Sequence, residues 1–445
     1  MIPGFDSRRL LLARLAFRNI RLNWRHSLAT MLAIMGGFAA VSLFDGFLLA
    51  LHEYNEEHYV NKGMVGHVII EREGAAEHIL EDLWGYSLSK EDQSSVVALL
   101  DGDQRVEASM RYLLLTGLIS NGKTNSLFIG SGLEEENGVK IRGEGWAWNT
   151  IAGLPLYRSP NPGLIMGSGL AQRLGCTFDP KVIQNKNGTY LAEERKLDCP
   201  GKNFQLSVTT EHSQVNAADL PVSGVTDFQL REFNDKVLVM PLEHAQRLFD
   251  TDRISRYVVL LKNPNMIPAF VRDIRARAKE RNLPLEAIPW IEHPVASMAK
   301  GGLEVMDVFR GLFLSVVAVI AAMSVANSMM KSINERIREI GTFRSFGFRR
   351  RDIIWLFSLE GLFLGFFSCL GGIAVTSLLA FVISNLGLTF NAGVLSTPMP
   401  LNFSMAFLTW VTTLATLSLI TFLASWLVSR KAAQMVVADA LRYIA

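Results

Sequence analysis

The sequence is poor in cysteine and in charge. Three cysteines in 445 residues are too few for a disulfide-stapled scaffold, and no CxxC pair or histidine cluster has metal-ligand spacing. We therefore expect no bound metal. The formal net charge is only +2, which leaves no overall basic field for nucleic acid. The charge-rich or repetitive tails of disordered chains are also missing.

Apolar residues, by contrast, are abundant. They make up 49% of the chain against 19% for charged residues, which is more apolar than is usual for soluble proteins. A bilayer core is crossed by about 20 helical residues. Four runs reach that length, and we predict transmembrane helices at residues 28–51, 305–330, 354–383 and 403–428.

Basic residues indicate how these helices are oriented. Arginine and lysine concentrate in residues 1–27, 331–353 and 429–445, so these segments and both termini are expected on the cytoplasmic side. The connector 384–402 contains no charged residue, as expected of an outer loop. The large segment 52–304 is then outside the cytoplasm. The basic leader is long and no cleavage site follows the first apolar run, so we expect an uncleaved anchor.

The large outer segment is predicted to be a folded α+β domain. Short alternating apolar runs, typical of strands, occur at residues 66–71, 111–120, 125–130, 236–241 and 256–262. Helical periodicity occurs at residues 241–250 and 269–282. The expected fold is a membrane protein of four transmembrane helices, with this domain inserted between the first and second helices.

One stretch matches a nucleotide-binding pattern. Gly117, Gly122, Lys123 and Thr124 in "GLISNGKT" fit the phosphate-binding P-loop, which requires a helix directly after the loop. Here strand-like runs lie on both sides and Asn121-Gly122 is typical of a two-residue hairpin turn. We therefore predict a structural turn and no ATPase activity in this chain.

The loop at 331–353 predicts a short amphipathic helix. Three isoleucines, Ile333, Ile337 and Ile340, share one face at helical spacing. A basic helix lying on the membrane surface is one interpretation. A docking element for a cytoplasmic partner is the other, because Glu335 and Glu339 on the remaining faces are poorly suited to anionic lipid.

Polar and small residues inside the predicted spans have two interpretations each. Asp45 and Asn327 are costly in lipid. In one interpretation they line a lateral substrate cavity. In the other, which we favour, Asp45 lies near the outer interface and Asn327 forms an interhelical hydrogen bond. Four glycines of the third span, Gly361, Gly365, Gly371 and Gly372, permit close helix packing and weakly favour a dimer seam. Glu360 beside them is assigned to the same packing.

The loop also resembles the signature of the FtsX-like, MacB-type permease family. The matching residues are Glu335, Arg336, Arg338, Glu339, Ile340, Gly341, Arg344, Gly347, Ile353 and Glu360. The N-terminal "LARLAFRNIRLNWRHSLATMLAIMGG", the outer "IMGSGLAQRLGC" and "KVLVMPLEHAQRLF", and the C-terminal "RKAAQMVVADALRYIA" with Ala440, Leu441, Arg442 and Tyr443 are similar to family segments in the same order. The resemblance covers nearly the whole chain.

This resemblance implies a permease subunit of an ABC transporter in the inner membrane, with a periplasmic outer domain. Family members pair with a second permease copy or a related permease and with a separate cytoplasmic ATPase dimer, which holds the ATP-Mg. No cofactor is therefore expected in this chain. The ATPase domain that fused members carry at the N-terminus is not expected either. The loop helix would act as the coupling helix that transmits ATPase motion. The residues implied at that contact are Glu335, Arg338, Glu339, Gly341, Arg344 and Gly347.

The chain departs from the family after "LAQRLG". An inserted segment with a predicted hairpin turn at Asn187-Gly188 follows. Cys176 and Cys199 bracket it on the oxidising side, so we predict that they form a disulfide, while Cys369 in the third span remains a thiol.

Three functions fit the resemblance. The first is release of lipoprotein or another lipid-anchored substrate, because "FDGFLLALHEYNEEHYVNKGMVGHVII" resembles the LolC/LolE branch. The second is MacB-like efflux with a periplasmic adaptor. The third is FtsX-like regulation of cell-wall hydrolases, whose outer domain is usually much smaller than residues 52–304. We rank them in that order, and a periplasmic chaperone or adaptor is the further partner that the first two imply.

Overall fold

The protein divides into two compact units. The computed structural model describes residues 4–22, 24–143, 150–178, 196–201, 203–228, 231–390, 398–405 and 407–434. The first unit comprises Met1–His52, Leu303–Thr389 and Pro400–Ala445, and the second comprises Glu53–Gly302 and Phe390–Met399. The predicted turn at Asn187-Gly188 and the C-terminal residues Ala440 to Tyr443 lie outside the described residues.

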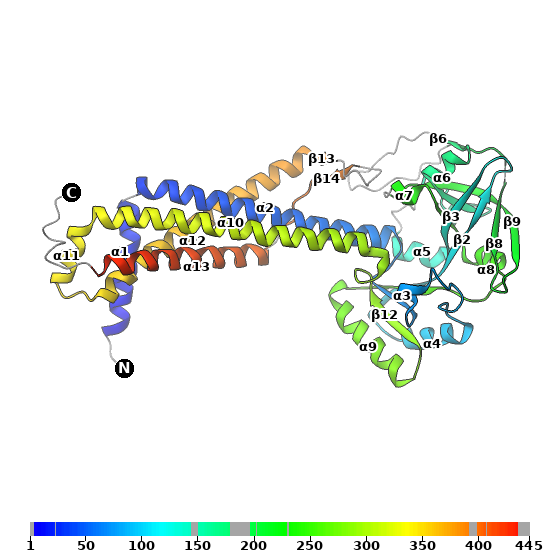
Figure 1. Ribbon diagram of the computed structural model, residues 1–445, viewed down its shortest axis with the longest axis horizontal. Coiled ribbons are helices and arrows are strands. Elements are labelled where there is room, and N and C mark those ends of the chain that lie inside the picture. The colour runs from blue at the N-terminus through cyan, green and yellow to red at the C-terminus, as the bar shows by residue number, and fades with distance from the viewer. Residues whose placement is uncertain are drawn as a thin grey trace. The chain divides into compact units, whose positions relative to one another are not determined.

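The first unit is helical. Its elements are α1 (Gly4–Leu22), α2 (Trp24–Glu56), α10 (Ser297–Glu335), α11 (Ile337–Ser345), α12 (Arg350–Leu386) and α13 (Phe407–Ala432) (Figure 1). Within the described ranges, four helices are long and apolar enough to cross a membrane, and they contain or overlap the predicted spans. The fourth begins at Phe407 rather than at residue 403. The π-helical segment Glu57–Lys62, which belongs to the second unit, continues α2.

The long helices are held together by a buried apolar core. Phe38 of α2, Val325 of α10, Phe357 of α12 and Leu417 of α13 belong to one cluster. These helices are apolar around most of their circumference, as expected of segments in contact with lipid on one side and with each other on the other.

The second unit is an α+β domain built on a ten-stranded mixed sheet. The strand order is β12 (Leu285–Pro289), β1 (Val68–Arg72), β11 (Arg256–Leu261), β2 (Val106–Ser120), β3 (Asn125–Leu133), β10 (Val237–Pro241), β5 (Leu164–Gly167), β9 (Val215–Thr226) and β4 (Thr150–Gly153), while β8 (Asn203–Thr209) pairs with β2 and β9. All five predicted strands and both predicted helices are present. The predicted α+β domain between the first two membrane helices is confirmed.

Helices cover the sheet on both faces. The helices of this unit are α3 (Ala75–His78), α4 (Lys90–Leu100), α5 (Glu135–Arg142), α6 (Ser168–Arg173), α7 (Arg231–Asn234), α8 (Leu242–Phe249) and α9 (Ile267–Glu280). Leu99 of α4, Phe249 of α8 and Phe270 of α9 share one core with the sheet. Ile141 of α5 and Trp290 belong to a second core. Two-residue strands form small separate ladders, β6 (Thr177–Phe178) with β7 (Leu197–Asp198) and β13 (Thr389–Phe390) with β14 (Met399–Pro400).

The P-loop-like stretch is a hairpin between β2 and β3. Strand β3 follows Thr124 directly, where a P-loop needs a helix, and Gly122 has the left-handed φ of 83°. The predicted two-residue turn is wrong, however, because Ser120 pairs with Asn125 and four residues close the hairpin. Asn121 stabilises this longer turn by accepting hydrogen bonds from the backbone N–H groups of Lys123 and Thr124, at 2.8 and 2.7 Å.

Candidate functional site

The candidate coupling site starts where α10 ends. Arg336 leaves the helical conformation, with φ −115° and ψ 20°, and separates α10 from α11. The single amphipathic helix predicted here is therefore two helices, and Glu335 belongs to the last turn of α10. The three isoleucines nevertheless point inward as predicted, because Ile333, Ile337 and Ile340 are all buried.

Most of the predicted coupling residues remain on the surface of this region. Glu335, Arg338 and Glu339 are exposed, Arg344 is half-buried and Gly341 is buried. Phe346, which directly follows α11, is 79% exposed. The short helix thus presents charges of both signs and one aromatic ring, which suits a protein partner better than a uniformly anionic lipid surface.

Gly347 ends α11 and turns the chain into α12. Its φ of 89° is in the left-handed region, which favours glycine. The N–H of Phe348 donates to the carbonyl oxygen of Phe343 at 3.1 Å, and their rings lie 5.4 Å apart. Asp352 then accepts from the N–H of Arg349 at 2.8 Å and caps α12. These contacts fix the direction in which α12 leaves α11.

Arg336 connects this turn to the interior of the helical unit. Its side chain is 11% exposed, and its Nε donates to Oε2 of Glu339 at 2.9 Å. Its Nη1 donates to Oε1 of Glu360 at 3.2 Å, and its guanidinium lies 5.5 Å from the centre of the Phe357 ring. Burial acts to lower the pKa of Arg336, and the carboxylates of Glu360 and Glu339 outweigh it and raise the pKa. The guanidinium is therefore charged.

Glu360 is the meeting point of three elements. It is 3% exposed, and Oε1 also accepts from Nδ2 of Asn19 at 2.6 Å. One carboxylate oxygen of α12 thus accepts hydrogen bonds both from α1 and from the residue that precedes α11. Helix packing was predicted for Glu360, but its two partners were not. Arg336 is recognisable only as part of the family signature, and Asn19 is detectable only as a polar residue on the face of Leu12 and Ala16.

The glycines of α12 pack against helices of the same chain. A Cβ on Gly361 would collide with Ser425, and one on Gly365 would collide with Thr421, both in α13. Gly371 and Gly372 face Met35 and Phe38 in α2. The predicted close helix packing at these glycines thus occurs within the chain, and the space beside each of them is already occupied there.

The two polar residues of the spans differ from each other. Asp45 of α2 is buried and accepts from Nε of Arg310 in α10 at 2.6 Å, so a charged pair joins these two helices. The partner was not predicted, and the position of Asp45 near the outer interface stays a prediction. Asn327 is exposed, and among the residues described by the structure it has no side-chain hydrogen bond.

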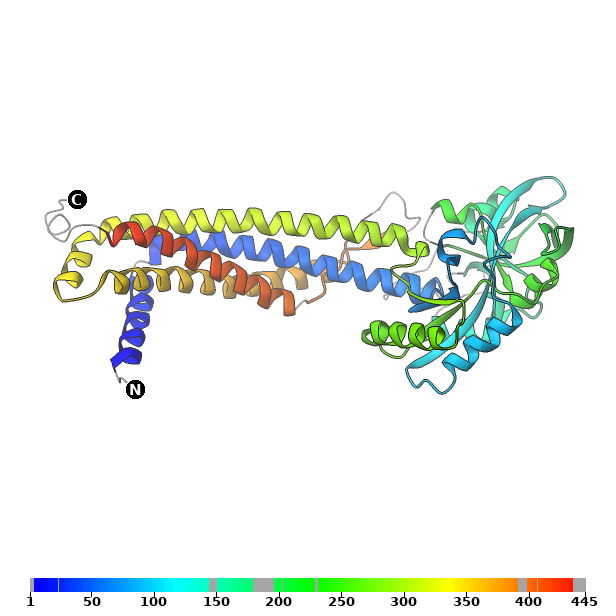
Figure 2. The same cartoon turned by 60° about the horizontal axis from the view of Figure 1, so that its bottom comes forward.

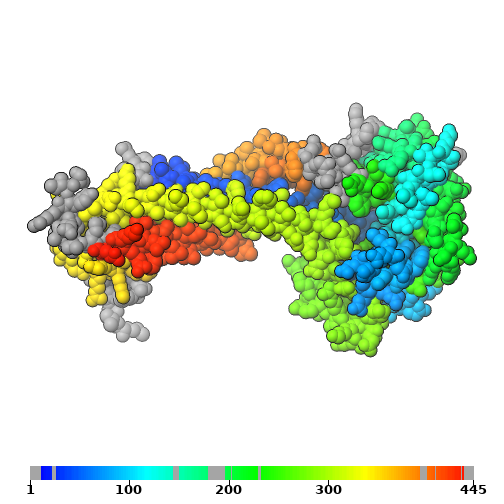
Figure 3. Space-filling model, viewed as in Figure 1, coloured from blue at the N-terminus to red at the C-terminus, as the bar shows by residue number. Residues whose placement is uncertain are grey.

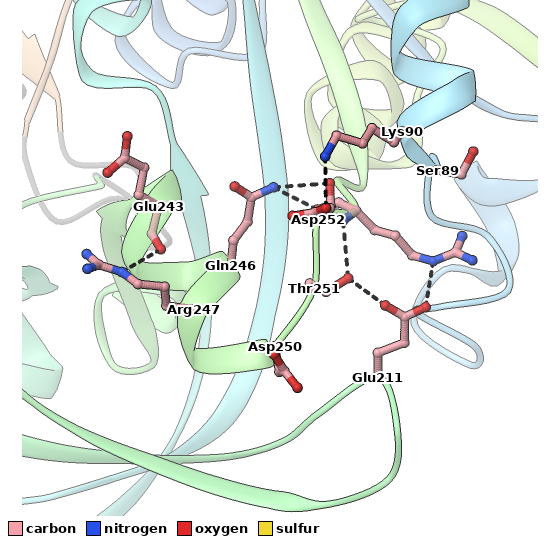
Figure 4. Close-up of a pocket in the computed structure, with 10 residues that line it drawn as sticks. Ser89, Lys90, Glu211, Glu243, Gln246, Arg247, Asp250, Thr251 and Asp252 are labelled. Atoms are coloured by element: carbon pink, nitrogen blue, oxygen red, sulfur yellow. Dashed lines mark hydrogen bonds and ion pairs between the residues drawn. The ribbon is translucent and has the colours of Figure 1, made fainter.

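The second unit contains the predicted disulfide and a polar depression. Cys176 and Cys199 are bonded, with β6 and β7 paired beside them, and Cys369 is a buried thiol. Figure 4 shows the depression, of about 740 Å³, whose charged side chains bond mainly to one another. Arg253 donates to Glu211 at 2.7 Å and Lys90 donates to Asp252 at 3.1 Å.

Known proteins resemble both units. Residues 27–277 match the MacB-like periplasmic core domain, and residues 311–437 match the FtsX-like permease C-terminal family. The macrolide export ATP-binding/permease protein MacB of Brucella abortus is 31% identical over 133 residues, 29% of this chain and 20% of that protein. The lipoprotein-releasing system transmembrane protein LolC of Neisseria meningitidis serogroup B is 23% identical over 293 residues, 63% of this chain and 65% of LolC. The matched part spans a fifth of MacB and just under two thirds of LolC.

Solved structures show weaker likeness. The periplasmic region of MacB from Actinobacillus actinomycetemcomitans has 10% identity and a TM-score of 0.32, over 54% of this chain and 94% of that one. The extracellular domain of the transporter YknZ from Gram-positive bacteria has 10% identity and a TM-score of 0.29, over 50% and 98%. The match to the periplasmic core domain alone covers more than half of the sequence, and the chain belongs to the family of FtsX-like, MacB-type ABC transporter permeases.

Proposed function

We propose that this chain is the permease subunit of an ABC transporter and that α11 is its contact with a separate cytoplasmic ATPase dimer. The observation that carries the proposal is the pairing of Arg336 with Glu360. It ties the start of an exposed, charged helix to a buried residue in the first third of a neighbouring membrane helix. A displacement of α11 by a partner would therefore act on α12 through a buried ion pair.

The ATPase contact is tested best at Arg338. This residue is exposed, and its side chain has no partner within the described part of the chain, so its replacement leaves the internal contacts intact. Loss of a charge-assisted contact costs about 1.5 to 3 kcal/mol. We expect R338E to weaken co-purification with the ATPase at least about tenfold and to abolish stimulated ATP hydrolysis. The matched control is E280K, a charge reversal at an exposed residue of α9. Equal loss in both variants, or in neither, contradicts the proposal.

The proposed setting is the inner membrane, with both termini in the cytoplasm and the second unit in the periplasm. The distribution of basic residues supports this orientation. Lys123 lies in the exposed turn between β2 and β3, and K123C in a cysteine-free background should react with an impermeant maleimide from the periplasmic side. Reaction only after the membrane is permeabilised would reverse the orientation.

A second permease copy, or a related permease, is part of the proposal. An apolar stripe on α10, formed by Val308, Leu312, Val319 and Met323, is 58 to 71% exposed, and Figure 3 shows this helix uncovered along the unit. Exposed Asn327 continues the stripe. An amide exposed to lipid is costly. A hydrogen bond from Asn327 to a helix of a second permease copy would remove that cost, so the exposed amide supports pairing at this stripe. N327C is expected to give an intermolecular disulfide in membranes, and N327L is expected to weaken the dimer.

We propose a lipid-anchored substrate, most specifically a lipoprotein, taken from the outer leaflet and passed to a periplasmic chaperone. The alignment with LolC over 63% of the chain supports this class. Acyl chains are held in a bilayer by about 0.8 kcal/mol per buried methylene, so their removal requires work such as an ATPase supplies. Depletion of the protein should leave lipoproteins in the inner membrane.

Efflux with a periplasmic adaptor is the second candidate. The higher identity to MacB, 31% over 133 residues, favours it. The same depletion experiment separates the two functions. Normal lipoprotein sorting together with new sensitivity to drugs or secreted peptides would contradict lipoprotein release and support efflux.

A further inference from the structure

Helix α1 has two different faces. Leu12, Ala16 and Asn19 are buried, and Leu12 and Ala16 pack with Leu356 of α12. Figure 2 shows α1, in dark blue, running across the end of the helical unit at a steep angle to the long helices. Over residues 12–22, one face of α1 thus packs against α12, and the opposite face is exposed.

The exposed face carries an unneutralised positive charge. Arg14, Arg18 and Arg21 are exposed and lie at spacings of four and three residues, so they are neighbours on one side of the helix. Residues 12–22 contain no acidic side chain, and within the described residues none of the three guanidinium groups has a hydrogen bond or ion pair. Like charges at this spacing repel one another, and a bound anion would relieve that repulsion.

An apolar flank lies beside these arginines. Phe17 is 50% exposed, and its ring lies 6.4 Å from the ring of Phe363 and 5.8 Å from the ring of Phe367. Both partners lie inside the α12 segment that is apolar enough to span a membrane. Phe17 therefore packs on the apolar part of α12, while the arginines beside it are exposed, which is an arrangement typical of a helix in a lipid headgroup layer.

We propose that this face of α1, formed by Arg14, Phe17, Arg18 and Arg21, is a binding site for the phosphates of anionic phospholipids. Guanidinium groups bind phosphate through paired N–H donors, and three of them on one helix face recognise a negatively charged headgroup layer. The acidic surface of a protein would satisfy the arginines equally well, but it would not explain the aromatic ring between them and the apolar part of α12.

The proposed lipid site and the contact with Glu360 lie on opposite faces of α1. Asn19, on the buried face of the same helix, donates to Glu360, which also binds Arg336. Lipid bound to the arginines holds α1 against the membrane and so holds Asn19 in contact with Glu360. This second consequence rests on the proposed function, whereas the binding site itself does not.

Lipid binding can be measured on the full chain, purified in detergent and delipidated, by native mass spectrometry with phosphatidylglycerol or phosphatidylcholine as the probe. A basic residue at an anionic surface changes binding about fivefold. The triple variant R14Q/R18Q/R21Q should therefore bind phosphatidylglycerol at least about tenfold more weakly, with phosphatidylcholine binding unchanged. The matched control R349Q/R350Q/R351Q removes the same charge from exposed arginines and should bind as the parent chain does.

Three outcomes would overturn the site. Equal loss in the control variant would show a diffuse charge effect, and unchanged binding in the triple variant would leave α1 without a role in lipid binding. Loss of ATPase co-purification in the triple variant, with phosphatidylglycerol binding intact, would make the face a protein contact. A chain that binds phosphatidylglycerol through α1 but recruits no ATPase supports the lipid site and contradicts only the proposed function.

Discussion

Arg336 and Glu360 form an ion pair, with Nη1 3.2 Å from Oε1, between the residue that separates α10 from α11 and the buried part of α12. Because Glu360 is 3% exposed, its charge depends on the guanidinium for compensation. Removing one partner of a buried pair costs about 3 to 5 kcal/mol, since the other charge remains buried.

We therefore expect R336A to lower the thermal unfolding temperature of the chain in detergent and to reduce the coupling of α11 to α12. E360Q should be milder, because a glutamine oxygen still accepts from Asn19. The double variant R336A/E360Q should be more stable than R336A, since no charge is left unpaired. If R336A and E360Q are simply additive in a double-mutant cycle, the pair has no energetic role.

The glycine contacts predict unequal effects within one helix. G361A should be destabilised by about 1 to 3 kcal/mol, because its Cβ would overpack against Ser425 in α13. S425G should restore part of the stability of G361A by removing the nearest obstacle, while the carbonyl oxygen of Thr421 remains 3.0 Å from the added Cβ. G371A is the control, since its Cβ would meet only the flexible end of Met35. Thermal unfolding in detergent measures all of these, and the absence of even partial rescue by S425G would contradict the contact between Gly361 and Ser425.

The turn after α11 gives a conformational prediction. Gly347 has a φ of 89° and open space around it, so G347A should cost about 1 to 2 kcal/mol through backbone strain alone and should increase amide exchange in α11. G311A in α10, where the added methyl group also meets nothing, should instead stabilise its helix by about 1 kcal/mol. Similar effects of the two changes would argue against the left-handed turn.

Asp103 predicts a pH dependence for the second unit. Side-chain hydrogen bonds from Arg105, at 2.9 and 2.7 Å, lower the pKa of Asp103 to about 2, below its ordinary value near 3.9. A lowered folded-state pKa contributes stability that is fully present above about pH 4 and is lost as the pH falls toward 2. We expect D103N to lose about 2 kcal/mol at pH 7 and to show a flatter stability curve between pH 4 and 2. D101N, at an exposed neighbour, should keep the parent profile.

Much of the architecture follows from local patterns. Apolar runs long enough for a bilayer predict α2, α10, α12 and α13, because a backbone in lipid satisfies its polar groups best as a helix. Period-two runs such as the one in β1 predict the sheet. The hairpin after Ser120 is also evident from Asn121-Gly122, although its length is not, since the side-chain hydrogen bonds of Asn121 stabilise a four-residue turn.

The candidate site could be predicted only in part. Exposed residues of α11 such as Arg338 and Glu339 are recognisable from their place in a charged loop. Arg336 carries the same charge two positions away, yet it points inward because the chain leaves the helix there. Helical spacing predicts the face on which a residue lies only within one continuous helix, and the break at Arg336 makes that prediction invalid.

The sequence by itself determined which helices are long and apolar enough to cross a membrane, which segments form strands of the sheet and where the basic charge is concentrated, because each of these depends on neighbouring residues along the chain. Only the tertiary structure decided that Asn19 and Arg336 share one oxygen of Glu360, although Asn19 and Glu360 are separated by 341 positions. It also decided that the glycines of α12 face α2 and α13. Such contacts depend on how each helix is rotated and packed against its neighbours, and many rotations are compatible with the same apolar run.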